Sequence, residues 1–219
     1  MLELAIIPLG YVIGSLPFGY WLPRLLAGVD IRTVGSGSTG ATNVWRAVGF
    51  KVGLGVALLD IGKGLAAALL GRWVGGDLIG VLTGCAAVVG HWRPLFMRLA
   101  RGGKMVATTA GVGLGLATYA TLAVVPVWIA VFLLTRYASV ASLASAAALP
   151  LFAFLFDAST PVVAFLVGAG IAIALLHKGN IGRLLHGTEN RFDLQRTRRC
   201  SRRREASLRA RCEPLKARP

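Results

Sequence analysis

Residues 52–71 read VGLGVALLDIGKGLAAALLG, an apolar run that carries one acid and one base near its centre. A helix of about 20 apolar residues is long enough to cross the hydrocarbon core of a bilayer. Asp60 and Lys63 are three positions apart and therefore share one face of such a helix. Because an unpaired charge inside a bilayer costs about 3 kcal/mol or more, we expect the two charges to pair and to face the interior of a helical bundle. The pattern leaves open whether this pair shapes an active site or only the packing.

The rest of the chain repeats this apolar pattern. Further apolar runs cover 2–22, 78–97, 105–120, 121–136, 140–156 and 160–177. The chain is 55% hydrophobic and 15% charged, whereas soluble domains carry about 25% charged residues. We therefore predict an all-α polytopic membrane protein with about seven transmembrane helices. The separation near 119–122 is weak enough for one long span there, and five spans would also fit if two apolar segments are re-entrant or interfacial.

The N-terminal run is expected to stay in the protein as a helix. It opens with Glu3 instead of the basic cluster of a signal peptide. Connections 23–51 and 91–104 each hold four Lys or Arg residues, whereas the connection after the second run holds only Arg72 with Asp77. The positive-inside rule then predicts an external N-terminus, a cytoplasmic C-terminus and cytoplasmic glycine-rich loops.

The chain divides into a membrane domain, residues 1–192, and a basic tail, residues 193–219. Thirteen of the 24 Lys and Arg residues lie from Lys178 onward. Residues 196–211 are rich in arginine but show no aromatic interleaving, so a nucleic-acid partner is not expected, and a disordered cytoplasmic tail that meets anionic lipids fits better. The three unevenly spaced cysteines form no disulfide framework.

A first polar segment, DIRTVGSGSTGATNVWR, covers Asp30–Arg46. Its glycines allow backbone N–H groups to point into one concavity that binds anions, and a helix that begins at Ala41 would add its own amides. Gly35 and Gly40 have the spacing of a nucleotide-binding P-loop, but Ala41 occupies the lysine position, so nucleotide hydrolysis is excluded. A plain flexible loop is the alternative that the composition also allows. Neither a metal nor a cofactor is expected.

A second polar segment, HWRPLFMRLARGGKMVATTAGVG, covers His91–Gly113. Gly102, Gly103 and Lys104 precede a helix that begins near Met105, which indicates a second anion site. The arginines of this segment are expected to set the topology. His91 ends an apolar run and is expected to be an interfacial residue and not a catalyst.

A third polar segment, HKGNIGRLLHGTENRF, covers His177–Phe192. His177 and Asn180 can face the same space because they are three positions apart. Glu189 is expected to fix an arginine or an amide, and Arg183 to bind lipid phosphate or flank the membrane. Arg136 and Ser142, in RYASVASLAS, could join the same pocket, with an interhelical hydrogen bond as the alternative for Ser142.

Taken together, these segments resemble the bacterial integral-membrane acyl-phosphate:glycerol-3-phosphate acyltransferase family. The matching segments, in family order, are GSLPFG, GVDIRTVGSGSTGATNVWRAVG, LLDIGKG, GHWRPLF, GGKMVAT, RYASVASLAS and HKGNIGRLLHGTENRF. The resemblance implies a multi-pass enzyme of the bacterial plasma membrane that acts in phospholipid biosynthesis. It would transfer an acyl group from acyl phosphate to the first hydroxyl of glycerol 3-phosphate, giving lysophosphatidate and inorganic phosphate. Membrane lipids and the enzyme that forms the acyl phosphate are the further partners expected.

The resemblance also assigns residues. The catalytic set it implies is Ser36, Arg46, Lys104, His177 and Asn180. The substrate-binding set it implies is Gly35, Gly37, Ser38, Gly40, Thr42, Asn43, Gly102, Gly103, Ser142 and Glu189. Backbone amides at 35–42 and 102–103 would hold the acyl phosphate, while Arg46 and Lys104 would meet phosphate oxygens of the acceptor. The base is His177 or, as we prefer, the acceptor's own phosphate.

Two positions depart from the family pattern. Ser38 stands where asparagine is usual, and Met105 stands where glycine is usual. Serine still forms hydrogen bonds and is expected to be tolerated. Met105 would lower activity, unless its backbone is ordinary helix and absorbs the change.

Two other function classes share some of these features. The commoner acyltransferases place an aspartate five residues after a histidine, but Phe96, Gly182 and Arg191 occupy that position here. A transporter or channel for phosphorylated solutes remains the main alternative, since basic loops and interior charges also serve permeation.

Overall fold

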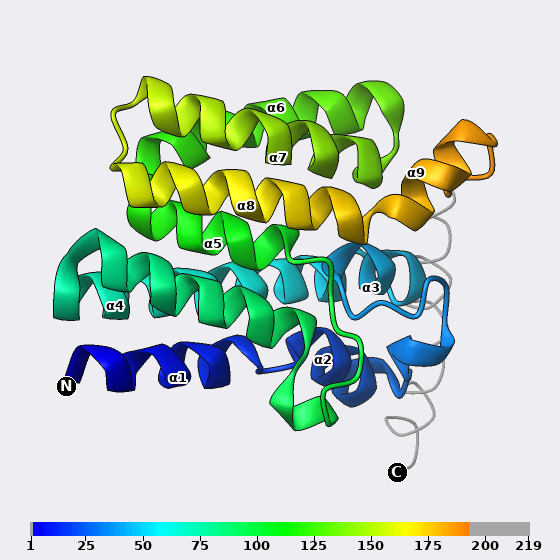
Figure 1. Cartoon of the computed structure of the whole chain (residues 1–219). Helices are drawn as coiled ribbons and strands as arrows, with labels where there is room; N and C mark the ends of the chain where they lie inside the picture. The colour runs from blue at the N-terminus through cyan, green and yellow to red at the C-terminus, as the bar shows by residue number, and fades with distance from the viewer. Residues whose placement is uncertain (1, 193–219) are drawn as a thin grey trace, which may run out of the picture.

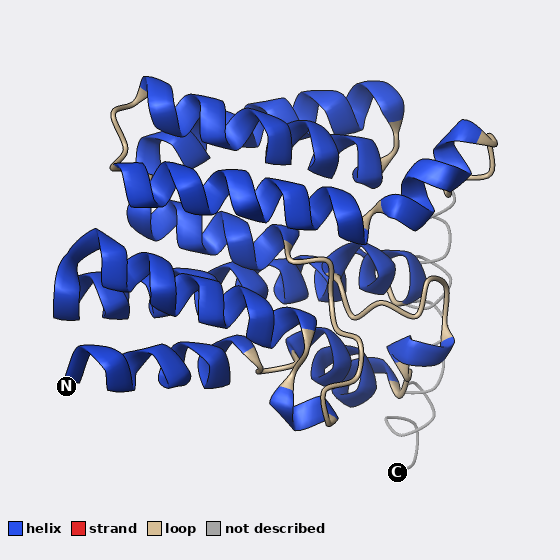
Figure 2. Cartoon of the chain, in the orientation of Figure 1, coloured by secondary structure: helices blue, strands red, loops and turns tan. Residues whose placement is uncertain are grey.

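The structure is a computed structural model that describes residues 2–192, and this part of the chain is entirely helix and loop (Figures 1 and 2). The elements in chain order are α1 (Leu2–Gly14), α2 (Phe18–Ala27), the 3-10 turn η1 (Ile31–Thr33), α3 (Ala41–Ala47), α4 (Phe50–Trp92), the 3-10 turn η2 (Leu95–Met97), α5 (Val106–Leu116), α6 (Thr118–Thr135), α7 (Ala138–Leu155), α8 (Thr160–Leu176) and α9 (Lys178–Leu185). The predicted tail, residues 193–219, lies outside the described residues.

Helix α4 is a hairpin of two antiparallel arms. Gly75 and Gly76 leave the helical conformation, and Gly76 has φ +69°, which glycine adopts without strain. The arms then pack so closely that a Cβ on Gly71 would lie 2.6 Å from the Ile79 carbonyl oxygen. These arms correspond to the separate predicted runs 52–71 and 78–97.

The membrane-crossing segments agree with a polytopic membrane protein, although not with every predicted span. Four apolar segments are long enough to cross a bilayer: Ala5–Ala27, Phe50–Met97, which holds both arms of α4, Thr118–Thr135 and Ala138–Leu155. The pair α8 and α9, bent by 55°, gives a fifth. The predicted span 105–120 is wrong as drawn. Helix α5 has 11 residues and a length of about 16 Å, too short alone for a core of about 30 Å.

The weak separation expected near 119–122 is a real break, placed slightly earlier. Ala117 has φ −140° and ψ 62°, so α5 ends before it and α6 starts after it. The first predicted helix is also broken, because Ser15, Leu16 and Pro17 separate α1 from α2. Both breaks are sites where the helical ladder is interrupted, which apolar periodicity alone does not reveal.

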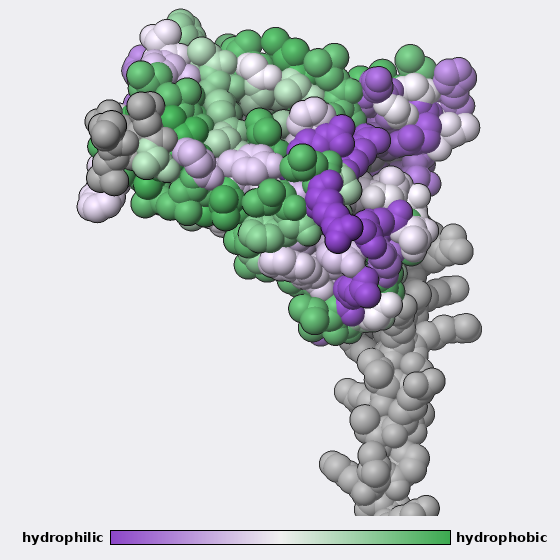
Figure 3. Space-filling model, turned by 60° about the horizontal axis from the view of Figure 1, so that its bottom comes forward, coloured by the Kyte–Doolittle hydropathy of each residue, from purple (hydrophilic) through white to green (hydrophobic). Residues whose placement is uncertain are grey.

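The chain alternates between two ends of the bundle. We call the end formed by residues 15–49, 93–105, 135–137 and 177–192 the loop end, and the end formed by 75–76, 117 and 156–159 the hairpin end (Figure 1). At the hairpin end the Asp77 carboxylate pairs with Arg72 Nε at 3.1 Å and accepts a hydrogen bond from the Ser159 hydroxyl at 2.6 Å. In Figure 3 hydrophilic surface gathers at the loop end, whereas hydrophobic surface covers most of the remaining visible face. All three polar segments of the sequence therefore lie at one end.

Glycines bring the helices into close contact. A Cβ on Gly14 would overlap the Ala87 backbone, which packs α1 against α4, and a Cβ on Gly111 would overlap the Ile61 carbonyl oxygen, which packs α5 against α4. Such close backbone approach is the usual packing device between membrane helices. It explains much of the high glycine content.

The buried charges form the predicted pair and gain a third member. Lys63 Nζ lies 2.8 Å from Asp60 Oδ1, and both side chains are 2% exposed. Lys63 also donates to the Leu16 carbonyl oxygen at 2.9 Å, which ties α4 to the break between α1 and α2. His91 Nδ1 lies 3.5 Å from Asp60 Oδ1. The expectation that His91 is interfacial is corrected, since this residue is buried beside the ion pair.

Candidate active site

A cavity of about 450 Å³ brings the polar segments together. Side chains from α3, α5, α7 and α9 line it, together with residues of α4, α6 and α8. Arg46, Lys104, His177 and Asn180 all belong to its lining. Segments separated by more than a hundred residues therefore meet in one space.

The glycine-rich loop is shaped by Asn43. The Asn43 amide donates to the carbonyl oxygens of Val34 (3.0 Å) and Ser38 (2.9 Å), and its Oδ1 accepts from the Ser36 amide at 3.1 Å. Gly35 permits the turn because its φ is +63°, a left-handed value that favours glycine. The Asn43 side chain is therefore occupied by hydrogen bonds within the loop. Neighbouring groups of the loop are the ones available to a ligand.

Those neighbouring groups line the cavity. Ser36, Ser38, Gly40 and Thr42 belong to its wall, whereas Gly35 and Gly37, with φ values of +63° and +67°, are not among its lining residues. The Ser38 hydroxyl accepts from the Gly40 amide at 3.2 Å. Helix α3 begins at Ala41 as expected, and no side chain caps its first turn. Backbone amides and hydroxyl groups at this wall are therefore able to bind an anion.

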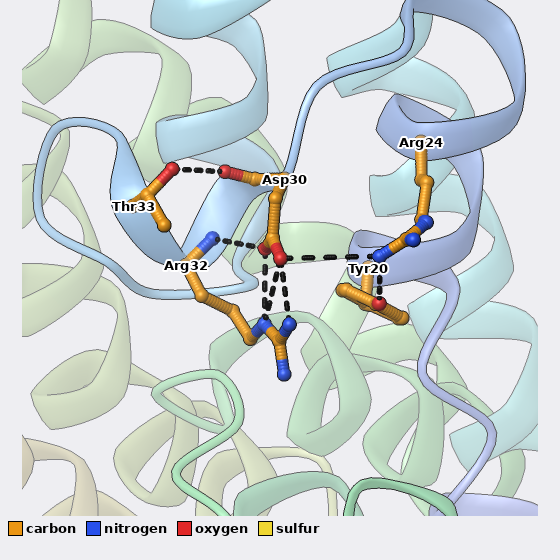
Figure 4. Close-up of polar contacts among 5 residues, drawn as sticks. All are labelled: Tyr20, Arg24, Asp30, Arg32 and Thr33. Atoms are coloured by element: carbon orange, nitrogen blue, oxygen red, sulfur yellow. Dashed lines mark hydrogen bonds and ion pairs between the residues drawn. The ribbon is translucent and has the colours of Figure 1, made fainter.

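The start of the same loop is anchored to α2 (Figure 4). The Asp30 carboxylate accepts from the Arg32 amide at 3.1 Å and from its guanidinium at 2.6 Å, and Arg24 lies 4.0 Å away while donating to the Tyr20 hydroxyl. The hydrogen bond from Arg32 lowers the pKa of Asp30 to about 2. This anchor fixes where the glycine-rich loop leaves α2.

The second glycine segment does not form the expected phosphate cradle. The Gly102 amide donates to the Trp92 carbonyl oxygen at 2.9 Å, and the Gly103 amide donates to the His91 carbonyl oxygen at 3.4 Å. Neither amide is left for a phosphate in this structure. Glycine is needed at 103 for another reason, since a Cβ there would overlap the His91 ring. The packing places Lys104 at the cavity.

Met105 occupies a backbone position that favours glycine. It precedes α5 with φ +70° and ψ −13°, and its side chain is buried in the core. A bulky residue in this left-handed region costs about 1–3 kcal/mol. The departure from the family pattern therefore falls where the backbone resists a side chain, and Met105 is not an ordinary helical residue.

Glu189 connects the remaining polar groups. Its carboxylate accepts from the Ser139 hydroxyl at 2.9 Å, the Asn180 amide at 2.7 Å and Arg183 Nε at 2.8 Å. Burial alone would raise the pKa of Glu189, but these three hydrogen bonds outweigh it and hold the pKa below its ordinary value. Lys104 Nζ in turn donates to Asn180 Oδ1 at 2.5 Å. Glu189 thus orients the amide that faces Lys104.

We call residues 187–192 the strap, because they lie against Arg46. Arg46 Nη2 donates to the Asn190 carbonyl oxygen at 2.7 Å, and its guanidinium carbon lies 4.3 Å from the centre of the Phe192 ring. The Phe192 amide donates to the Arg136 carbonyl oxygen at 2.9 Å. Arg136 therefore contributes a carbonyl oxygen to the strap, and it is not part of the cavity wall.

His177 and Ser142 face the cavity with defined partners. His177 Nδ1 lies 2.8 Å from the Ile173 carbonyl oxygen. A carbonyl oxygen only accepts, so Nδ1 carries the proton and Nε2 is left for a ligand. Ser142 accepts from the Trp128 indole at 3.3 Å, an interhelical bond between α6 and α7, and also lines the cavity. Ser142 therefore both lines the cavity and takes part in an interhelical hydrogen bond.

Several polar lining residues escaped the sequence-based prediction, among them His91, Thr109 and Ser145. Ser145 could have been found from its helical spacing of three after Ser142. His91 and Thr109 required knowledge of which helices are neighbours. Asp60, whose role the sequence left open, also lines the cavity.

The chain is similar to known proteins along most of its length. Residues 4–187 match the family profile described as glycerol-3-phosphate acyltransferase. The chain is 43% identical over 191 residues to the glycerol-3-phosphate acyltransferase of Desulforudis audaxviator, covering 87% of this chain and 96% of that protein. It is 45% identical over 193 residues to the protein of the same name from Gloeobacter violaceus, covering 86% of this chain and 94% of that protein.

Solved structures show the same fold. The crystal structure of PlsY (YgiH), an integral membrane glycerol 3-phosphate acyltransferase, in its glycerol 3-phosphate form matches with a TM-score of 0.85 and 38% identity, covering 90% of this chain and 98% of that chain. The lysophosphatidic acid form matches with a TM-score of 0.82 and 37% identity.

Proposed function

The chain belongs to the glycerol-3-phosphate acyltransferase family, and we propose that its cavity transfers an acyl group from acyl phosphate to the sn-1 hydroxyl of glycerol 3-phosphate. The products are lysophosphatidate and inorganic phosphate, the first acylation step of membrane phospholipid synthesis. One observation carries the proposal: cations and amides from three distant segments meet at the mouth of a cavity whose remaining wall is mostly apolar. A phosphorylated amphiphile fits such a space with its phosphate at the mouth and its acyl chain in the interior.

For this reaction the protein has to align the two substrates and neutralise the charge of the departing phosphate. The acceptor oxygen attacks the acyl carbon, a new C–O bond forms, the bond to the phosphate oxygen breaks, and the hydroxyl proton ends on phosphate. The departing phosphate is a good leaving group, so no covalent enzyme intermediate is required. Positioning two reactants side by side lowers the barrier greatly, and fixed donors stabilise the charge that moves.

The residues divide between the two phosphates. We assign the wall formed by Ser36, Ser38, Gly40 and Thr42 to the phosphate of the donor, without help from the 102–103 amides. Arg46 and Lys104 bind phosphate oxygens of the acceptor, because a guanidinium and an ammonium are the strong partners of phosphate. Asn180, Ser142 and the free His177 nitrogen orient the glycerol hydroxyl groups.

The acceptor's own phosphate is the base we assign. The His177 ring bonds to the Ile173 carbonyl oxygen and not to a carboxylate. His91 does approach a carboxylate, but Asp60 is already paired with Lys63 and the ring packs on Gly103. Neither histidine has the arrangement of a carboxylate-held base. A phosphate dianion beside the attacking hydroxyl takes the proton instead.

The enzyme is an integral membrane protein, and its orientation belongs to the proposal. We place it in the bacterial plasma membrane with the N-terminus outside and the loop end in the cytoplasm, supported by the basic connections 23–51 and 91–104. A soluble acceptor then reaches the cavity from the cytoplasm, and the enzyme that forms the acyl phosphate would deliver its product to the same side. The relatives' name and the cavity's mostly apolar wall favour acyl transfer over solute transport.

The donor can be tested directly. Purified full-length protein should release phosphate from palmitoyl phosphate when glycerol 3-phosphate is present, and mass spectrometry should find 1-palmitoyl-glycerol 3-phosphate. Palmitoyl-CoA should give no product. Product from the thioester alone, or uptake of labelled glycerol 3-phosphate into liposomes without any acyl donor, would reject the proposal.

A further inference from the structure

Two buried hydroxyl groups on the cavity wall have no hydrogen-bond partner within the described part of the chain. They are Thr109 Oγ1 on α5 and Ser145 Oγ on α7, and the residues are 3% and 8% exposed. Helical Ser and Thr commonly bond to the carbonyl oxygen four residues earlier, as Thr121 does with Ala117 at 3.0 Å on the same wall. An unpaired buried hydroxyl costs about 1–3 kcal/mol. A ligand that brings an acceptor would remove this cost.

Other unpaired buried atoms give useful contrasts. Thr83 and Thr108 also lack partners, but neither lines the cavity. The Trp45 indole is a donor on the wall, and its ring packs against Phe192 at 4.6 Å near the mouth. Among the described residues, Thr109 and Ser145 therefore carry the buried hydroxyl groups of the wall that have no partner.

Their positions fall where the wall changes from polar to apolar. Thr109 follows Met105 by one helical turn, about 6 Å along α5, and Ala110 continues the wall beyond it. Ser145 follows Ser142 by about 4.5 Å along α7, and Leu149 continues the wall beyond it. Both helices begin at the loop end. A donor with its phosphate at the mouth and its chain in the interior places its carbonyl group at this boundary.

We propose that Thr109 and Ser145 donate hydrogen bonds to the carbonyl oxygen of the acyl donor and stabilise the negative charge that develops there during transfer. This inference rests on the proposed function. As the acceptor oxygen attacks, the electron pair of the C=O bond moves onto the carbonyl oxygen, and it returns when the bond to the phosphate oxygen breaks. Donors fixed before the reaction stabilise that oxyanion without reorganisation.

The test removes one hydroxyl at a time and keeps the shape. Thr109→Val and Ser145→Ala should each lower kcat about 100-fold with palmitoyl phosphate, because a lost oxyanion donor acts on the transition state. KM for glycerol 3-phosphate should stay unchanged. Thr109→Ser and Ser145→Thr keep the hydroxyl and should recover most of kcat.

Thr108→Val is the matched control. It removes a buried, unpaired hydroxyl from the neighbouring residue of α5 but not from the cavity wall, so kcat should stay that of the wild type. Wild-type kcat in both Thr109→Val and Ser145→Ala would overturn the inference, as would an equal loss in Thr108→Val, which would trace the effect to helix packing. A wild-type enzyme inactive with acyl phosphate would reject the proposed function first, before any variant is measured.

Discussion

At the scale of single residues, Met105 shows how a backbone position constrains its side chain. The position has φ +70°, where glycine is favoured over alanine, whereas inside a helix alanine is favoured by about 1 kcal/mol. We therefore expect Met105→Gly to be more stable than Met105→Ala by about 1 kcal/mol. Both variants lose the same buried side chain, so their difference isolates the backbone.

Thermal unfolding in one detergent measures that difference. Ala107→Gly, in ordinary helix two residues later, is the control and should be less stable than the wild type. A Met105→Ala variant at least as stable as Met105→Gly would show that the left-handed conformation carries no cost here.

Lys104 sets the pH dependence at the residue scale. Burial lowers the pKa of its ammonium to about 8. The cationic form binds phosphate and is present below that pKa, so kcat/KM for glycerol 3-phosphate should fall as the pH rises through about 8. Lys104→Arg keeps its proton at higher pH, so its alkaline limb should shift upward even if the rate is lower. Identical alkaline limbs in the two enzymes would exclude Lys104 as the titrating group.

At the scale of elements, the strap and α9 depend on one carboxylate. Glu189 holds Asn180, Ser139 and Arg183, and hydrogen bonds to a charged group contribute about 1.5–3 kcal/mol. Glu189→Gln turns an NH₂ group toward these donors, so kcat/KM for glycerol 3-phosphate should fall about 30-fold, equivalent to about 2 kcal/mol.

Asn190→Ala is the control for that change. Arg46 contacts the backbone carbonyl oxygen of residue 190 and not its side chain, so this variant should keep kcat/KM. If Glu189→Gln also keeps it, the orientation of Asn180 does not depend on the carboxylate.

The sequence was a good guide to some elements and a poor guide to others. The Asp60–Lys63 pair followed from helical spacing and the cost of lone charges, and the start of α3 followed from the glycines before it. The occupied amides of Gly102 and Gly103 did not, because the carbonyl oxygens they meet come from the end of α4. The buried position of His91 was missed because the residues that surround it, Asp60 and Gly103, come from other parts of the chain. Helix α5 proved short because its ends are set by Met105 and Ala117 conformations that hydropathy does not record.

At the scale of the whole molecule, structural contacts and the candidate active site lie at opposite ends of the bundle. The hairpin end is tied by Arg72, Asp77 and Ser159, whereas the loop end gathers the cations and the glycine-rich loop around one cavity. Positive charge in the sequence predicted this separation, because basic residues cluster in alternate connections. What the sequence could not give is the depth of the cavity, which depends on how α5, α7 and α8 pack.

The central claim is that both phosphorylated substrates meet in this one cavity at the loop end. The most direct measurement is a crystal structure of the wild-type protein soaked with glycerol 3-phosphate. We predict phosphate density within hydrogen-bond distance of Arg46 Nη2 and Lys104 Nζ, with the glycerol hydroxyl groups toward His177 and Asn180. Density for the acceptor anywhere outside this cavity, in crystals of active enzyme, would contradict the account.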